Sequence, residues 1–343
     1  MSVKVHAEQH RRVVAVTGGA GFIGSHLCRR LLENGNRVRC IDNLHRGAWE
    51  NLGDCASQVE LVTADLRNLD QTLEALKGAD VVYHLASIVG GIGVYIKHAS
   101  TVWLDNTLID QNVFRAVIQN RISRLFYASS GHVYPEALQQ TPSGPDLLED
   151  MAYPAQPGLS YGWAKLMGEK SLGYLLDEHQ WLHVALARIV GAYGPNQDID
   201  LDTGAIIPVL CHRAARWPDL QPFRVWGTGQ ETRSYIFIDD VIDAFVRAVD
   251  ALEHTRCLGP FNLGNHGRVT ISRIVDTVVS VSGKPIDVFY DTAVATRIWG
   301  QAADTALARR LLSGWAPRVS LEDGISRVYE DVARRVAQRE GHA

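Results

Sequence analysis

The chain of 343 residues is predicted to adopt an α/β fold, a Rossmann-type doubly wound parallel sheet with a smaller C-terminal α/β lobe. Two observations favour this class. Short apolar runs rich in β-branched residues alternate with amphipathic segments through the first half of the chain, as expected for parallel strands covered by helices on both faces. A glycine-rich segment, residues 18–24, separates the first apolar run from the first amphipathic segment, where a strand turns into a helix in this fold.

The individual elements follow from the same patterns. Helices are expected at the amphipathic segments, and the first of them ends at an Asn-Gly pair that favours a helix C-terminus. Beyond about residue 191 the elements become shorter and are punctuated by glycine and proline. Strands are expected at 13–17, 37–41, 59–63, 81–85, 124–129 and 183–188, helices at 22–34, 70–76, 101–120 and 161–178, and a strand-turn-helix that returns to the main sheet at 236–246.

The composition restricts the class of partner. A content of 46% hydrophobic and 21% charged residues is typical of a globular protein, and a net charge of −4 gives no indication of a nucleic-acid or anionic-membrane partner. The five cysteines are scattered without metal-ligand spacing, so neither a disulfide framework nor a metal site is expected. No apolar run approaches the length of a membrane span. The odd number and scattered positions of the cysteines predict reduced thiols in a cytoplasmic protein.

The segment after the first strand has the spacing of a dinucleotide-binding turn. Gly18, Gly21 and Gly24 fit Gly-x-x-Gly-x-x-Gly, which allows a tight turn and close approach of the backbone to a pyrophosphate. The helix that follows presents free N–H groups to that anion. Asp42 follows the second strand about 20 residues later, where a carboxylate can hold a ribose 2′-hydroxyl. This carboxylate favours NAD over NADP, although the nearby Arg46 would favour a 2′-phosphate.

Four polar residues downstream form a candidate catalytic set. Tyr161 and Lys165 lie one helical turn apart and project from the same face. A nearby ammonium and a cationic nicotinamide ring both favour the phenolate, so the pKa of Tyr161 is expected to be lowered. Ser130, at the end of the fifth strand, can hydrogen-bond the same oxygen. His132, with an ordinary pKa of about 6.5, suits proton transfer at neutral pH and suggests that carbon-acid chemistry follows an oxidation.

Together these residues resemble the extended short-chain dehydrogenase/reductase family, the sugar-nucleotide epimerases and dehydratases, from Val13 to about Ala333. Within that family the chain most resembles the GDP-mannose 3,5-epimerases. The segments that carry the closer resemblance are 89–94, 105–107, 126–130 and 225–234. The resemblance implies an NAD-dependent enzyme that acts on a nucleotide sugar. It also implies a homodimer in which the helices near 101–120 and 161–178 pair into a four-helix interface.

The resemblance further indicates which residues bind each ligand. The glycine loop near residue 90 would lie against the sugar, and two arginines would grip the diphosphate. The cofactor-binding residues are expected to be Gly18, Gly21, Phe22, Ile23, Gly24, Asp42, Asn43, Asp65, Leu66, Leu85, Ala86, Ser87, Tyr161 and Lys165. The substrate-binding residues are expected to be Val89, Gly90, Gly91, His132, Gly191, Arg233 and Arg297.

These sites divide the expected fold into three parts. Residues 1–12 are expected to be a flexible N-terminal tail. Residues 13–190 together with about 231–258 would form the NAD-binding Rossmann domain. Residues 191–230 and 259–334 would form the substrate-binding lobe.

By the same resemblance, oxidation of sugar C4 by bound NAD acidifies the protons on C3 and C5. An acid/base residue removes one of them, and return of the hydride completes the cycle. The residue two before Tyr134 differs between branches of this family, with cysteine in the 3,5-epimerases and glutamate in the 4,6-dehydratases. Here it is His132, and the hypothesis is that His132 is the acid/base residue for C3 or C5 epimerisation.

Other interpretations stay open. His132 could merely bind substrate in a simple C4 epimerase, or it could remove the C5 proton in a dehydratase. Asp42 argues against an NADPH-dependent reductase, and the Tyr161 and Lys165 pair argues against a non-catalytic NAD-sensing protein. The loop 196–204 lacks the lysine that partners the cysteine of the 3,5-epimerases. Either a carboxylate such as Asp200 or a water molecule would have to take the place of this lysine, or the enzyme would invert only a single centre.

Overall fold

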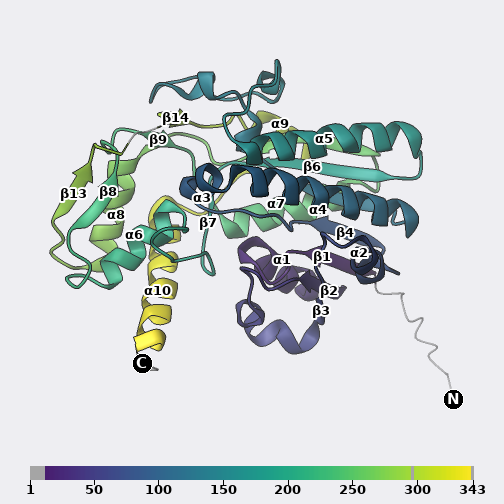
Figure 1. Cartoon of the computed structure of the whole chain (residues 1–343), viewed down its shortest axis with the longest axis horizontal. Coiled ribbons are helices and arrows are strands. Elements are labelled where there is room, and N and C mark those ends of the chain that lie inside the picture. Colours follow the sequence, from purple (N-terminus) through teal and green to yellow (C-terminus); the bar gives the residue numbers. More distant parts are fainter. Residues whose placement is uncertain (1–11, 295–296, 341–343) are drawn as a thin grey trace.

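A seven-stranded parallel sheet forms the centre of the computed structural model, which describes residues 12–294 and 297–340 (Figure 1). The strands lie in the order β11-β6-β5-β4-β1-β2-β3, and each neighbouring pair is parallel. Their bounds are β1 (Val13–Thr17), β2 (Arg37–Asp42), β3 (Glu60–Thr63), β4 (Val81–His84), β5 (Arg124–Ser130), β6 (His183–Ile189) and β11 (Cys257–Leu263). The predicted doubly wound fold is therefore confirmed.

Helices cover both faces of this sheet because successive strand residues point to opposite sides. Val14 and Val16 belong to one apolar core and Ala15 to another. The first core contains residues of α1 (Phe22–Glu33) and α7 (Ile238–Ala251). The second contains residues of α2 (Leu69–Leu76), α4 (Ala99–Gln119) and α5 (Ser160–Glu178). Strands buried on both faces explain the nearly continuous apolar runs of the sequence.

The remaining elements either follow a strand of the central sheet in the sequence or belong to the C-terminal part of the chain. Helices α6 (Ile206–Ala215), α8 (Ile271–Ser282) and α10 (Leu321–Glu340) contact one another beside the sheet. Short strands pair as β10-β7, β12-β9-β14 and β13-β8. The bounds of the other elements are η1 (Trp49–Gln58), α3 (Ile92–Lys97), η2 (Gly131–Val133), η3 (Glu136–Gln139), η4 (Glu149–Ala152), β7 (Ala192–Tyr193), β8 (Phe223–Trp226), β9 (Thr232–Arg233), β10 (Ile236–Phe237), β12 (Val269–Thr270), β13 (Val288–Asp291), β14 (Gly300–Gln301) and α9 (Ala306–Leu311).

A buried arginine fixes the segment that follows β5. The Arg188 side chain, only 1% exposed, pairs with Glu169 on α5 at 2.7 Å. It also donates to the hydroxyl of Tyr134 at 3.2 Å and to the carbonyl oxygen of Glu149 at 2.6 Å. Removing one partner of a buried pair would leave an uncompensated charge, so β6, α5 and the segment carrying residues 131–134 are held as a unit.

Several expectations about organisation stay predictions. Residues 1–11 of the expected N-terminal tail lie outside the described residues, and the division into two lobes is a proposal. Strand β11 joins the main sheet as far as Leu263, beyond residue 258, where the dinucleotide-binding part was expected to end. No helix within residues 12–294 and 297–340 combines the length and apolar character of a membrane span, and the cytoplasmic location stays a prediction.

Candidate active site

A cavity of about 1030 Å³ lies along the edge of the sheet where β1, β2, β4, β5 and β6 end. The carboxyl ends of parallel strands are the usual ligand-binding edge of an open α/β sheet. Every residue of the predicted cofactor-binding set lines this cavity. Of the other candidates, Ser130, His132, Val89, Gly90 and Gly191 line it as well. One continuous space therefore joins the expected cofactor and sugar sites.

The turn between β1 and α1 has the shape that a pyrophosphate requires. Gly18 has a φ of +69°, in the left-handed region that favours glycine. A Cβ on Gly24 would overlap the carbonyl oxygen of Gly18, so the helix can approach the turn closely because residue 24 has no side chain. Helix α1 begins after Gly21 with no side-chain cap, which leaves backbone N–H groups for an anion.

The carboxylate of Asp42 is fixed at the end of β2. Its Oδ2 accepts from the backbone N–H of Ala20 at 3.1 Å, and its Oδ1 accepts from Leu44 at 2.8 Å. Burial raises the pKa of Asp42, and these backbone hydrogen bonds act against that rise. Arg46 is directed elsewhere, because its guanidinium donates to the carbonyl of Val89 and to the carboxylate of Asp198. The group held at this end of the cavity is thus a carboxylate, which suits a ribose hydroxyl better than a 2′-phosphate.

Asp65 lines the cavity, but its carboxylate is engaged in an ion pair. Arg67 binds it at 2.7 Å and reaches Asp105 on α4 at 2.9 Å. The hydrogen bond from Arg67 holds the pKa of Asp65 below its ordinary value. Contact with the cofactor is therefore left to the backbone of Asp65 and to Leu66, and stays a prediction.

The structure brings Tyr161, Ser130 and Lys165 together as predicted. The Tyr161 hydroxyl forms hydrogen bonds with Ser130 and also with Ser87, at the end of β4. The Nζ of Lys165 lies 6.0 Å from the centre of the Tyr161 ring. Burial raises the pKa of Tyr161, Asp110 raises it further, and the two serine hydrogen bonds act in the opposite direction. The prediction that the pKa of Tyr161 is lowered is therefore wrong for the protein without a bound nicotinamide ring.

A buried hydrogen-bonded chain beneath Lys165 was not expected from the sequence. The Thr17 hydroxyl lies 2.8 Å from Nδ1 of His84, whose Nε2 lies 3.0 Å from Oδ1 of Asp110. The Tyr127 hydroxyl donates to Oδ2 of Asp110 at 2.6 Å, and Nζ of Lys165 lies 4.8 Å above the Tyr127 ring. Burial lowers the pKa of Lys165, whereas the negative charge of Asp110 raises it. Asp110 therefore helps to keep a lysine with only 1% exposure protonated.

In the sequence, only two polar residues in apolar surroundings pointed to this hydrogen-bonded network. His84 ends an apolar strand, and its complete burial among hydrogen-bond partners gives it a structural role. Asp110 lies on the buried side of α4, where an apolar residue would be usual. A buried carboxylate in such a place needs partners, and the sequence did not show which they were.

His132 lies among aromatic rings at the sugar end of the cavity. Its ring is 5.8 Å from that of Tyr161 and 5.7 Å from that of Tyr95, and both contacts are edge-to-face. Burial lowers the pKa of His132 to about 4, and the positive charge of Arg233 contributes to the decrease. The expectation that His132 titrates near neutral pH is therefore wrong, and its imidazole is neutral at pH 7.

Two predicted diphosphate ligands lie outside this cavity. Arg233 donates to the carbonyl oxygens of Thr232 and Ile298, each at 2.8 Å. Arg297 pairs with Glu136 at 2.8 Å. Gly91 is also absent from the lining, and its N–H donates to the carbonyl of Thr203 at 2.8 Å. Arg233 acts on the site through its charge on His132, and a grip on the diphosphate by either arginine stays a prediction.

The acidic loop 196–204 does not supply the carboxylate suggested for it. Asp198 lines the cavity but is paired with Arg46. The Oδ1 of Asp200 accepts from the backbone N–H groups of Asp202 and Thr203, which lowers its pKa, and Asp200 is outside the cavity lining. Asp200 is therefore a poor candidate for the partner of His132.

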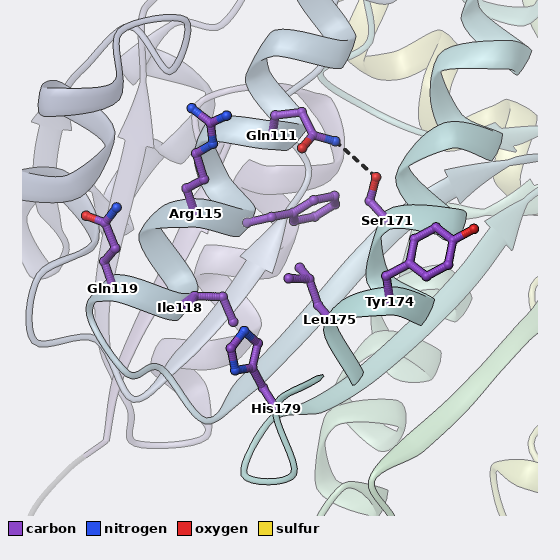
Figure 2. Close-up of a pocket in the computed structure, with 9 residues that line it drawn as sticks. Gln111, Arg115, Ile118, Gln119, Ser171, Tyr174, Leu175 and His179 are labelled. Atoms are coloured by element: carbon purple, nitrogen blue, oxygen red, sulfur yellow. Dashed lines mark hydrogen bonds between the residues drawn. The ribbon is translucent and has the colours of Figure 1, made fainter. Parts of the chain in front are cut away.

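A second, smaller cavity of about 360 Å³ lies between α4 and α5 (Figure 2). Gln111 on α4 donates to the Ser171 hydroxyl on α5 at 3.0 Å across it. Arg115, Ile118, Tyr174 and other residues of the two helices complete the wall. None of the predicted catalytic residues contributes to this cavity, so it belongs to the outer surface of the helix pair.

The main cavity defines the class of protein. A glycine turn before an uncapped helix, a fixed carboxylate on the second strand, and a Tyr-Lys pair hydrogen-bonded to serine are the parts of a nicotinamide-dependent enzyme on a Rossmann-type sheet. Within residues 12–294 and 297–340, no cluster of three His, Cys, Asp or Glu side chains could hold a metal ion.

Comparison with known proteins assigns the family. Residues 14–264 match the NAD dependent epimerase/dehydratase family, and the chain belongs to that family. The chain is 30% identical to GDP-mannose 3,5-epimerase from Arabidopsis thaliana, over 92% of this chain and 81% of that protein. It is also 30% identical to UDP-glucose 4-epimerase from Mycolicibacterium smegmatis, over 92% of this chain and 96% of that protein.

A solved structure agrees with this assignment. The UDP-N-acetylglucosamine 4-epimerase from Methanobrevibacter ruminantium M1 superimposes with a TM-score of 0.81 and 26% identity, over 96% of this chain and 99% of that one. The expected family, the fold and NAD as the cofactor are confirmed.

Gly24→Ala tests the turn as the cofactor site. The added methyl group overlaps the Gly18 carbonyl and forces α1 away from the turn. We expect the NAD affinity to fall by about 1–3 kcal/mol, or roughly ten- to a hundredfold, in isothermal titration calorimetry. Gly173→Ala on α5 is the control, because its Cβ would meet nothing within 4 Å. Wild-type NAD affinity in Gly24→Ala would count against this site.

Proposed function

We propose that this protein is an NAD-dependent nucleotide-sugar epimerase that acts through a transient 4-keto sugar, with His132 as the acid/base residue at C3 or C5. The observation that carries the proposal is the position of His132, whose imidazole contacts the ring of Tyr161 in the same cavity. The similarity to a GDP-mannose 3,5-epimerase supports it, and the similarity to 4-epimerases makes oxidation at C4 the common first step.

Tyr161 and the residues around it carry out the oxidation of C4. When bound, NAD supplies the hydride acceptor. Tyr161 removes the hydroxyl proton, while Ser130 and Ser87 hold its oxygen in place. Tyr161 can accept that proton only as the phenolate, which burial disfavours in the protein by itself. The buried ammonium of Lys165, maintained by Asp110, and the positive charge of the nicotinamide ring of bound NAD would favour the phenolate before the proton leaves the sugar.

The second step requires a base next to the new ketone. Protons on C3 and C5 are acidified by the carbonyl at C4, and His132 offers an uncharged imidazole nitrogen to accept one of them. Because the pKa of His132 is about 4, it is already in the basic form at neutral pH. Its low basicity makes it a weaker base than an ordinary histidine, and proximity to the bound sugar has to compensate for that.

This low basicity also favours the second candidate, a simple C4 epimerase in which His132 only binds the sugar. In such an enzyme no proton leaves carbon, and the acid/base partner missing from the loop 196–204 is not needed. A dehydratase needs the same base at C5 together with a proton donor for the departing C6 hydroxyl. The three reactions differ in whether solvent hydrogen enters the product and in the mass of that product.

Deuterium incorporation tests the role of His132. GDP-mannose, UDP-glucose and UDP-glucuronic acid are incubated with the holoenzyme in D₂O, and the products are analysed by NMR and mass spectrometry. We expect deuterium at C3 or C5 without loss of water, and His132→Ala to lower this exchange by about 10²–10⁴-fold while C4 oxidation continues. The exposed His254→Ala is the control. Inversion at C4 without deuterium would establish the simple C4 epimerase instead.

The pH dependence of exchange provides an independent test. His132 is active as the neutral base, so protonation at low pH removes activity. We expect kcat/KM for deuterium exchange to be flat between about pH 5 and 7 and to fall about tenfold per pH unit below about pH 4. A decrease that already begins near pH 6.5 would show that His132 titrates as an ordinary histidine and would contradict the buried, neutral state.

The proposal includes a homodimer formed through α4 and α5. These helices contact each other, and both carry exposed large apolar side chains, among them Tyr174 in the wall of the second cavity (Figure 2). A cluster of such side chains on one face favours a protein partner over water. The exposed residues are Leu104 (61%), Leu108 (44%), Trp163 (39%), Met167 (46%) and Tyr174 (65%). An isologous contact would bring two copies of each helix into a four-helix bundle.

Charged substitutions on this surface test the dimer. We expect wild-type protein to elute as a dimer in size-exclusion chromatography with light scattering, and Leu104→Glu with Tyr174→Glu to shift it to a monomer, because paired carboxylates would be buried at the interface. The control is Trp226→Glu on β8, also an exposed aromatic side chain (51%) but far from α4 and α5 in the sequence. A monomeric wild-type protein would contradict the dimer.

A further inference from the structure

Inversion of a carbon next to a ketone requires a base to take one proton and an acid to supply another from the opposite face. The loop 196–204 provides no lysine for this task, and Asp200 lies outside the cavity lining. We propose that Tyr95 is a further catalytic residue, the proton donor that complements His132. This inference rests on the proposed acid/base role of His132 at C3 or C5.

The position of Tyr95 connects it to both catalytic rings. It lies on α3, lines the main cavity, and is only 6% exposed. Its ring stacks on that of Tyr161 at 5.0 Å with 15° between the planes. The same ring makes an edge-to-face contact with His132 at 5.7 Å. Tyr95 and His132 come from separate elements, α3 and η2, and both side chains line the same cavity.

The Tyr95 hydroxyl is held in one direction and free to donate in another. Its oxygen accepts the backbone N–H of Gly90 at 3.2 Å, which fixes it against the glycine loop expected to contact the sugar. Within residues 12–294 and 297–340, no acceptor is found for its own proton. Burial raises the pKa of Tyr95, so this proton stays on the oxygen at neutral pH and is available as an acid.

The other proton donors near His132 have different tasks. Tyr161 and Lys165 act in the proposed oxidation and reduction at C4. The Ser87 hydroxyl donates to the amide oxygen of Asn106 at 2.8 Å, and the Ser130 hydroxyl lowers the pKa of Tyr161 in that same step. Arg46 is paired with Asp198. Tyr95 is a protonated, uncharged donor in direct ring contact with His132 that none of these steps uses.

The proposed step balances in protons and needs no oxidant. The imidazole of His132 takes the proton from C3 or C5, and the electron pair of that C–H bond passes into the enolate of the 4-keto sugar. The Tyr95 O–H bond then breaks as a new C–H bond forms on the other face of the same carbon. The tyrosinate recovers a proton from solvent while the imidazolium loses one. A weakly acidic phenol suits this step, because it gives up its proton only to a base as strong as an enolate.

Tyr95→Phe separates the acid from a structural role, because it keeps the stacked ring and removes the hydroxyl. The holoenzyme is assayed in D₂O with GDP-mannose, UDP-glucose and UDP-glucuronic acid. Absorbance of the reduced nicotinamide reports C4 oxidation, and NMR reports deuterium and configuration. We expect oxidation and deuterium wash-in to continue with retained configuration, while inversion falls by about 10²–10⁴-fold. Tyr153→Phe, an exposed tyrosine outside the cavity, is the control.

Each outcome decides a different point. Normal inversion by Tyr95→Phe would overturn the role of Tyr95 and leave that of His132 intact. An equal loss of oxidation, exchange and inversion would show that the hydroxyl only supports the Gly90 loop, and would also overturn the donor role. Absence of deuterium exchange from the wild-type enzyme with all three nucleotide sugars would overturn the proposed function and Tyr95 together.

Discussion

The site depends on the charge interaction between the buried carboxylate of Asp110 and the ammonium group of Lys165. Lys165 carries its ammonium group in a wall that water does not reach, and burial by itself would favour the neutral amine. Asp110 supplies the opposite charge, and its own ionisation is supported by Lys165, His84 and Tyr127, which outweigh the cost of its burial. The pair would be costly if either partner were missing, so α4 and α5 are held together at the level of the active site.

The same carboxylate connects the cofactor turn to Lys165. His84 bridges Asp110 to Thr17, and the Thr17 hydroxyl accepts from the backbone N–H groups of Leu85 and Ala86. The last residue of β1 thereby orients the end of β4, and both segments line the cavity next to the glycine turn. Satisfied polar groups in an apolar interior allow few other arrangements, which explains how a site made from five strands keeps one geometry.

Local patterns made the fold and the cofactor site predictable from the sequence. The glycine spacing, the carboxylate after the second strand and the Tyr-Lys spacing each involve residues whose separation fixes their geometry. Contacts between distant residues were not predictable in this way. Arg297 is separated from Glu136 by 161 positions, and nothing in the local sequence around Arg297 predicted their ion pair.

The degree of burial of each ionisable side chain was the other property that could not be predicted from the sequence. The tendency of His132 and Tyr161 to ionise depends on how much water reaches them. Both rings contact Tyr95, whose aromatic ring in the sequence indicated no particular role. The expected pKa values assumed solvated side chains. The actual shifts are dominated by burial, which lowers the pKa of the imidazole and raises that of the phenol, so both groups are uncharged.

The distribution of charge within the cavity follows from these effects and bears on the chemistry. Its charged groups include Lys165, whose pKa the negative charge of Asp110 raises, and the ion pair of Arg46 with Asp198 in the cavity wall. The sugar end between them presents neutral rings from Tyr95, His132 and Tyr161. An uncharged, poorly hydrated pocket strengthens the interaction of each developing charge with its nearest hydrogen-bond donor. In the proposed reaction, a negative charge that forms on the C4 oxygen would be stabilised mainly by the hydroxyls of Tyr161, Ser130 and Ser87, and the rings around His132 would control the acidity of the neighbouring carbon atoms.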